Sequence, residues 1–181
     1  MTGSSSGGAE PGQAGQGPEV DVLIESTRWQ ALPAAEDIVR RAIARAARAA
    51  QAKAVPYPFE AELSVLLCDD EAMAGLNARW RGHDRPTSVL SFPAPQRAPA
   101  AACLDPVRPA LLGDIAIAYE TVAREAAEQG KPLTDHLAHL AIHGFLHLLG
   151  YDHQRDGEAE RMERLERDIL AQIGIADPYD G

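Results

Sequence analysis

Alternating apolar and polar residues along the chain predict β-strands. Residues 20–24 and a stretch from about 59 to 67 show the two-residue period of a half-buried strand. Residues 87–92 form a third β-prone run, and residues 113–119 form a fourth, with Ile115 and Ile117 on one face. The sequence therefore predicts a sheet of about four strands.

Apolar residues at a helical period lie between and after these strands. Pro33 suits the first turn of a helix rich in alanine and arginine, and Asp69 or Asp70 suits the N-cap of the next helix. Gly130 is expected to end a later helix, and Thr134 to cap the one after it. The predicted helices span residues 34–50, 70–80, 120–129, 134–149 and, after a turn at 151–157, a last stretch to about 173.

The order of these elements predicts an α+β fold in a single domain, with a mixed sheet and helices packed against it. The length of 181 residues suits one core, and a hydrophobic content of 45% is typical of a globular protein. We expect a disordered tail at 1–18 and a folded domain at 19–175 that carries a proline-rich loop at 93–111. A short C-terminal tail at 176–181 completes the expected organisation.

A histidine-rich segment is the most informative part of the chain. His143 and His147 are four residues apart, so on a helix they share a face and can bind one metal ion. Gly150 can adopt the left-handed conformation that ends a helix, which would bring His153 back as a third ligand. Three nitrogen ligands leave the fourth position of an ion such as zinc to water, as in catalytic sites. We therefore predict a metal site on this helix and the turn after it.

Gly144 bears on the kind of reaction. Zinc proteases with the long histidine motif have the same ligand spacing, but a glutamate general base follows their first histidine. This chain has Gly144 at that position, and glycine has no side chain to accept a proton. The spacing supports a metallopeptidase and Gly144 opposes it, which favours a hydrolase that acts on another kind of bond.

The charge pattern is uneven. A net charge of −10 opposes nucleic-acid binding in general, because affinity for phosphates depends on positive charge. Basic residues nevertheless gather at Arg79, Arg81 and Arg85, so a local basic cleft stays compatible with the sequence. The acidic residues of the last predicted helix are interspersed with arginines and are expected on a solvated face; they are Glu158, Glu160, Glu163, Glu166 and Asp168.

The chain resembles the YbeY family, whose members are metal-dependent single-strand endoribonucleases that act in bacterial ribosomal RNA maturation. Segment 143–153 matches the histidine motif of that family. Two further blocks match in the family's order, and together with that motif they extend the resemblance over roughly residues 20–175. The blocks are Leu76-Asn77, Trp80-Arg81 and Pro86-Thr87-Ser88-Val89-Leu90-Ser91-Phe92-Pro93, and then Leu112-Gly113-Asp114-Ile115.

The resemblance implies that His143, His147 and His153 bind one metal ion, usually taken to be zinc. It also implies that Arg81 is the important active-site arginine, and a guanidinium there can bridge phosphate oxygens as charge builds on them. The family usually has Asp or Asn where this chain has Ser88, which weakens any polar role at that position.

Other residues are candidates for supporting the metal ligands or the substrate. A metal-bound imidazole usually donates its second N–H to a carboxylate or a carbonyl. His139 lies one helical turn before His143, and Asp114 and Asp152 lie in the matching motifs. We expect these three residues, with Ser88, to surround the site.

The resemblance also implies partners and a location. It implies single-stranded RNA as the substrate, the small ribosomal subunit and its proteins as partners, and no role for DNA or a membrane. No apolar stretch is long enough to span a membrane and the N-terminus lacks a signal pattern, which together with the resemblance indicates the cytoplasm. A further alternative is a non-catalytic ribosome assembly factor whose zinc holds the helices together, although structural zinc sites normally have four protein ligands.

Overall fold

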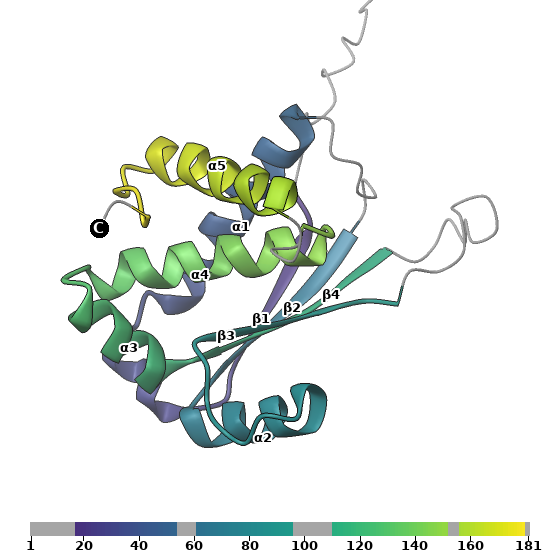
Figure 1. Cartoon of the computed structure of the whole chain (residues 1–181). Helices are drawn as coiled ribbons and strands as arrows, with labels where there is room; N and C mark the ends of the chain where they lie inside the picture. The colour runs from purple at the N-terminus through teal and green to yellow at the C-terminus, as the bar shows by residue number, and fades with distance from the viewer. Residues whose placement is uncertain (1–16, 54–60, 96–109, 152–155, 180–181) are drawn as a thin grey trace, which may run out of the picture.

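The computed structural model describes residues 17–53, 61–95, 110–151 and 156–179 (Figure 1). Its sheet contains β1 (Glu19–Ile24), β2 (Ala61–Cys68), β3 (Val89–Pro93) and β4 (Ala110–Ala118) in the order β1-β2-β4-β3. β2 pairs in parallel with both β1 and β4, whereas β3 runs antiparallel to β4 at the edge. The mixed four-stranded sheet and the α+β class are thus confirmed.

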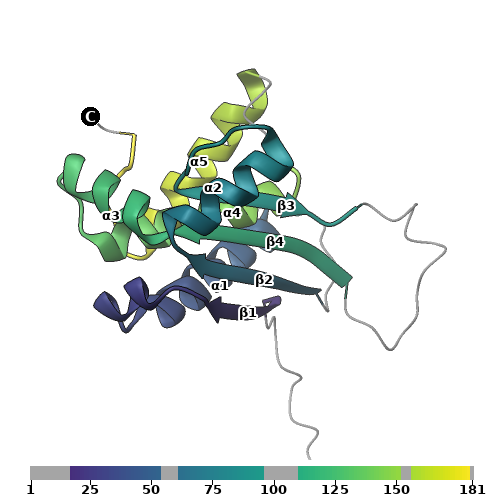
Figure 2. The same ribbon diagram turned by 90° about the horizontal axis from the view of Figure 1, so that it is seen from below.

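Helices cover the two faces of the sheet unequally. α1 (Ala35–Ala52) and α4 (Leu133–Leu148) pack on one face, and α5 (Asp156–Gln172) lies over them as an outer layer (Figure 1). α2 (Asp70–Arg81) lies on the opposite face, near β3 and β4, as the second view also shows (Figure 2). α3 (Tyr119–Glu128) leads from β4 to α4.

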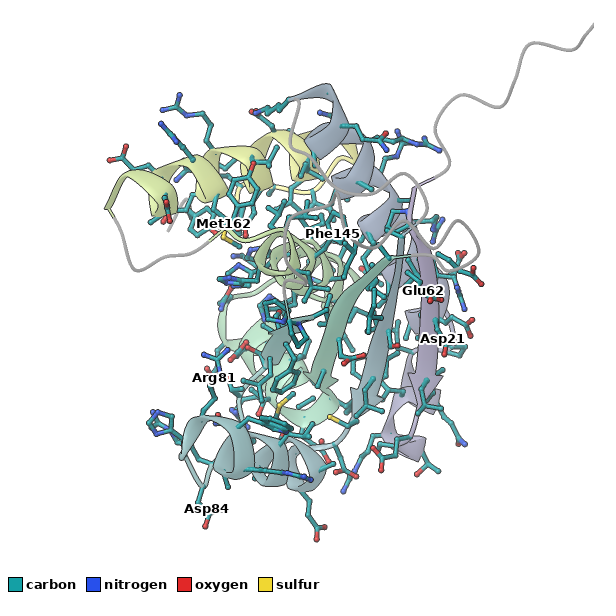
Figure 3. The ribbon with its side chains drawn as sticks, turned by 90° about the vertical axis from the view of Figure 1, so that its right-hand side faces the viewer. Asp21, Glu62, Arg81, Asp84, Phe145 and Met162 are labelled. Carbon is teal, nitrogen blue, oxygen red and sulfur yellow. The ribbon has the colours of Figure 1, made fainter. Side chains whose placement is uncertain are left out.

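α4 is the central helix of the core. It lies between the sheet below and α5 above, so most of its surface is buried. Phe145 packs into the core below α5, and Met162 lies between α5 and α4 (Figure 3). A helix that is surrounded in this way must be apolar on nearly all sides, which explains why its polar residues are few and mostly histidines.

The bounds of several helices and strands differ from the predicted ones. A short 3-10 helix, η1 (Thr27–Ala31), was not expected, and β4 starts at Ala110, three residues before the predicted strand. Asp69 caps α2, since its side chain accepts from the backbone N–H of Ala72 at 3.0 Å. The expectation that Thr134 caps α4 was wrong, because the helix begins one residue earlier and its N-cap is Pro132.

Parts of the predicted organisation fall outside the described residues. These are the tail up to residue 16, the start of the second predicted strand at 59–60, most of the proline-rich loop at 96–109, residues 152–155 of the predicted turn, and residues 180–181 of the C-terminal tail. None of the helices in the described ranges has the length and apolar character that a membrane span requires.

Candidate metal centre

α4 places two histidines side by side. His143 and His147 lie one turn apart on the same face, with ring centroids 4.6 Å apart, and both are half-buried. Their Nε2 atoms are 3.1 Å apart. The period of the helix alone is sufficient to predict that these two imidazoles lie close together.

The end of α4 returns the chain towards His147. Gly150 adopts a positive φ of 90°, and the Tyr151 N–H bonds back to the Leu146 carbonyl at 3.2 Å, as in a glycine-terminated helix. This turn brings the Tyr151 carbonyl to 2.8 Å from His147 Nδ1. A carbonyl only accepts, so His147 Nδ1 carries the proton and donates it. His153 and Asp152 lie beyond this turn, outside the described residues.

A buried carboxylate from α5 holds the other histidine. His143 Nδ1 lies 2.8 Å from Glu166 Oε1, and His139 Nε2 lies 3.3 Å from Glu166 Oε2. Near the C-terminus of the chain, the Tyr179 hydroxyl also donates to Glu166. Burial raises the pKa of the Tyr179 phenol, and its bond to Glu166 raises it further, so the phenol keeps its proton.

Glu166 is ionised in spite of its burial. Burial raises the pKa of a carboxyl, but the hydrogen bonds from two histidines and a tyrosine outweigh it and hold the pKa of Glu166 at about 2. An ionised carboxylate only accepts, so His143 Nδ1 donates to it.

The expectation that Glu166 lies on a solvated helix face was wrong, because the residue is 0% exposed. It sits four residues after Met162 and three before Ile169, both of which are fully buried. Its position on the apolar stripe of the helix was the signal in the sequence that could have identified it.

The histidines and Glu166 could hold a metal ion on either side of His143. On the Nδ1 side, His139, His143 and Glu166 each offer one ligand atom, all within 4.8 Å of one another. On the Nε2 side, His143 and His147 face each other. His139, predicted as a supporting residue, thus shares a carboxylate with His143.

Gly144 is where α4 touches the sheet. A Cβ at this position would lie 3.0 Å from Ile115 Cγ2 and 3.2 Å from the Ser91 hydroxyl. A side chain at this position would therefore require the Ile115 and Ser91 side chains to shift by a few tenths of an ångström. The close packing of α4 on the sheet thus favours a glycine where the peptidase motif has its general base.

Arg81 reaches the same edge of the sheet from the opposite face. α2 ends at Gly82, which adopts a positive φ of 73°, and an Arg81 guanidinium N–H donates to the Ser91 carbonyl at 3.4 Å. The Ser91 hydroxyl donates to the Gly144 carbonyl at 3.2 Å. Two contacts thus connect Arg81 with the residue after His143, and Figure 3 shows Arg81 in the space between α2 and α4.

The loop after α2 is anchored by the first matching block. The buried Asn77 donates from its amide nitrogen to the Arg85 carbonyl at 2.7 Å. Together with the turn at Gly82, this contact sets the direction in which the chain leaves Arg81.

The two other described supporting candidates lie on β4 and just before β3. Ile115 faces α4, and because successive strand residues point to opposite faces, the exposed Asp114 points to the α2 face. The structure thus does not bring Asp114 to the histidines. Ser88 precedes β3, and its carbonyl accepts from the Ala118 N–H at 3.0 Å.

Together the fold and the site define a class: single-domain α+β proteins with a histidine-rich centre that could hold a metal ion on a helix packed against a mixed sheet. The family model described as "Endoribonuclease YbeY" matches residues 24–174. This chain belongs to the YbeY family.

Relatives with that name cover most of the chain. Endoribonuclease YbeY of Rhodopseudomonas palustris strain BisA53 is 56% identical over 90% of this chain and 90% of its own length. The protein of the same name from Nitrobacter winogradskyi is 53% identical over 90% of this chain and 82% of its own length. A solution structure from Thermotoga maritima aligns over 90% of this chain and 99% of that one, at 23% identity and a TM-score of 0.44, a likeness too loose to support an argument.

Proposed function

We propose that this protein is a zinc-dependent endoribonuclease that cleaves single-stranded RNA during maturation of the small-subunit ribosomal RNA in the cytoplasm. Relatives at 51–56% identity carry the name of this activity over most of the chain. The proposed catalytic unit is the domain at 19–175, and the proposed partners are the small ribosomal subunit and its proteins.

The facing Nε2 atoms of His143 and His147 carry the proposal. Both Nδ1 atoms donate to acceptors, one to a carboxylate and one to a carbonyl. Each neutral ring then presents a lone pair at Nε2, and two lone pairs 3.1 Å apart repel unless a cation lies between them. Two ligands of a tetrahedral zinc ion, each 2.0–2.1 Å from the metal, lie about 3.3 Å apart, close to this spacing.

We assign the metal to the Nε2 side, with His143, His147 and His153 as ligands. Glu166 and the Tyr151 carbonyl then orient the first two ligands through their Nδ1 protons. Bound zinc would supply Lewis acidity towards a phosphoryl oxygen and lower the pKa of a bound water. Asp152 is proposed to lie beside this centre.

Arg81 is the proposed phosphate-binding residue. Its guanidinium donates to the Ser91 carbonyl, and the hydroxyl of the same serine donates to the Gly144 carbonyl of α4. A planar guanidinium can bridge two phosphate oxygens and stabilise their charge as it increases in the transition state. Ser88, just before β3, is proposed to contact the substrate near that phosphate.

The two alternatives fit the site less well. A peptidase of this motif needs a carboxylate at position 144, where this chain has a glycine packed closely against Ile115. A non-catalytic assembly factor would need a closed zinc site with four protein ligands, whereas the proposed set has three.

The proposal is tested by comparing cleavage of a labelled single-stranded RNA by the wild-type protein and by His147→Ala, with the metal content of both determined. We expect cleavage and metal to be lost together. His139→Ala distinguishes the two sides of His143: it should keep its metal, and loss of metal in that variant would move the centre to the Nδ1 side.

Arg81→Ala should keep its metal and lose most of its RNA cleavage, about 100-fold or more, because a group that stabilises charge only in the transition state is removed. The measurement is the cleavage rate together with the metal content. Arg41→Ala is the control, since Arg41 lies exposed on α1 in a pair with Asp37. Full activity of Arg81→Ala would contradict the role assigned to this residue.

A further inference from the structure

One of the two tryptophans is left exposed beside Arg81. Trp80 is 60% exposed, whereas Trp29 is 1% exposed in the core. An indole has a large apolar area whose exposure to water is unfavourable, so an exposed one next to a proposed active site suggests that a ligand covers it.

The ring of Trp80 has two neighbours among the described aromatic and cationic contacts. It packs at a tilt of 60° on the half-buried Phe92 of β3, with ring centroids 5.9 Å apart. The guanidinium carbon of Arg79 lies 5.4 Å from the indole centroid. Phe92 therefore fixes the position of the indole. Arg79, the other neighbour, is a long, exposed side chain that can move aside.

The position of this indole relates it to the proposed cleavage site. Trp80 is adjacent in the chain to Arg81, which contacts the Ser91 carbonyl, and Phe92 follows Ser91 in the edge strand β3. Ser91 faces α4 and Phe92 faces α2, because strand side chains alternate. The indole and the guanidinium thus contact consecutive residues of the edge strand, Phe92 and Ser91.

The charges around Trp80 suit an RNA strand. Arg79, Arg81 and Arg85 lie within seven residues of one another, with Asp84 as the acidic residue among them. Positive groups for the backbone and an aromatic face for a base are the two elements that proteins combine to bind single strands.

We propose that Trp80 is a stacking platform for an unpaired base that flanks the phosphate bound by Arg81. The base takes the place of the Arg79 guanidinium on the ring, and Arg79 then becomes available to a phosphate. In a duplex both faces of a base are covered by its neighbours, so this platform selects single-stranded RNA. The inference rests on the proposed function and adds to it a subsite and a physical basis for strand selectivity.

The test is steady-state cleavage of a single-stranded RNA by the metal-loaded full chain. Trp80→Ala should raise KM about tenfold, the effect of one lost base–aromatic stack, with kcat within about threefold. Trp80→Tyr, which keeps an aromatic face, should restore KM to within about threefold of the wild-type value. Leu23→Ala is the matched control, because Leu23 is 63% exposed on β1 at the opposite edge of the sheet, and it should behave as the wild type.

A substrate series separates stacking from a structural role. Removing the base of one nucleotide next to the cleavage site should raise KM for the wild type and leave that of Trp80→Ala unchanged. Trp80→Ala should also discriminate less between single-stranded and double-stranded RNA. Equal KM values for wild type and Trp80→Ala, or an abasic effect of the same size in both, would overturn the platform, while failure of the wild type to cleave any RNA would overturn the proposed function instead.

Discussion

At the scale of single residues, the candidate centre depends on which nitrogen of each histidine carries the proton. His147 and His143 both donate from Nδ1, the first to a backbone carbonyl and the second to Glu166. The first acceptor, the Tyr151 carbonyl, is close in the sequence, because the turn at Gly150 brings the backbone after α4 back to the His147 ring. The second acceptor, Glu166, comes from another helix, and it keeps the proton of His143 on Nδ1.

Glu166→Gln should weaken metal binding about 10- to 100-fold, because the carboxylate that orients His143 and increases its basicity becomes a neutral amide. The measurement is competition for zinc with a chelator of known affinity. Glu163→Gln is the control: it lies on the same helix, half-exposed, and bonds to Arg167 rather than to a histidine. Unchanged affinity in Glu166→Gln would show that His143 does not depend on this carboxylate.

His136 links α4 to α3 in a buried position that predicts a pH effect. It is 5% exposed, and burial lowers the pKa of its imidazole below 6.5 despite the bond from Nε2 to Glu125 at 2.9 Å. Below pH 6.5 the unfolded chain therefore takes up a proton more readily than the folded one, and the free energy of unfolding falls.

His136→Phe should lose less stability than the wild type between pH 7 and pH 5.5, because the residue that resists protonation in the folded state is gone. Urea denaturation of the metal-free proteins at the two pH values measures this difference. Parallel losses in the two proteins would contradict the assignment.

At the scale of elements, the pairing of β4 with its neighbours requires a glycine. Gly113 has a φ of 132°, next to a bulge at which Leu112 is the extra residue opposite β2. A Cβ on Gly113 would lie 2.2 Å from the Phe92 carbonyl oxygen in β3. The close approach of β3 and β4 keeps Ser91 and Phe92 at their positions between α2 and α4.

Gly113→Ala should lower the free energy of unfolding by about 3–5 kcal/mol, since both backbone strain and a backbone clash are introduced. Gly75→Ala is a matched control on the open side of α2, where a Cβ meets nothing within 4 Å, and should gain up to about 1 kcal/mol from helix propensity. Urea denaturation of both variants measures the two effects. A Gly113→Ala protein as stable as the wild type would show that β3 and β4 can separate without cost.

At the scale of the whole molecule, helices of two layers meet at the candidate centre, and the sheet links this centre to a third. α4 supplies the histidines and α5 supplies Glu166 from the outer layer, while Arg81 of α2 bonds to Ser91 of β3, which bonds in turn to Gly144 of α4. A metal ion bound by α4 and the following turn should therefore stabilise the native arrangement of these layers by mass action.

Removal of the proposed metal ion by a chelator should lower Tm by several degrees, because a ligand at 100 times its Kd adds about 3 kcal/mol and 1 kcal/mol corresponds to about 2–4 °C at this size. His147→Ala should show no such shift. Thermal melts of both proteins with and without chelator measure it. Complete unfolding of the wild type on chelation at 25 °C would instead favour the structural role of the assembly-factor alternative.

The sequence by itself determined the local part of this protein. The two-residue and 3.6-residue periods predicted the strands and helices, and the spacing of His143, His147 and Gly150 predicted a pair of imidazoles on one face of a helix that then turns back. These features follow from the geometry of neighbouring residues, so the chain order is enough to derive them.

The tertiary structure decided which distant groups meet that helix. Glu166, read from its charge pattern as solvated, is buried against His143, and Asp114, predicted near the site from its motif, points to the opposite face of the sheet. Arg81 is linked to α4 through Ser91 of β3: the guanidinium donates to the Ser91 carbonyl, and the Ser91 hydroxyl donates to the Gly144 carbonyl. Such contacts depend on how whole elements pack, and the packing of one helix on another is set by the sum of many apolar contacts rather than by the spacing of any one motif.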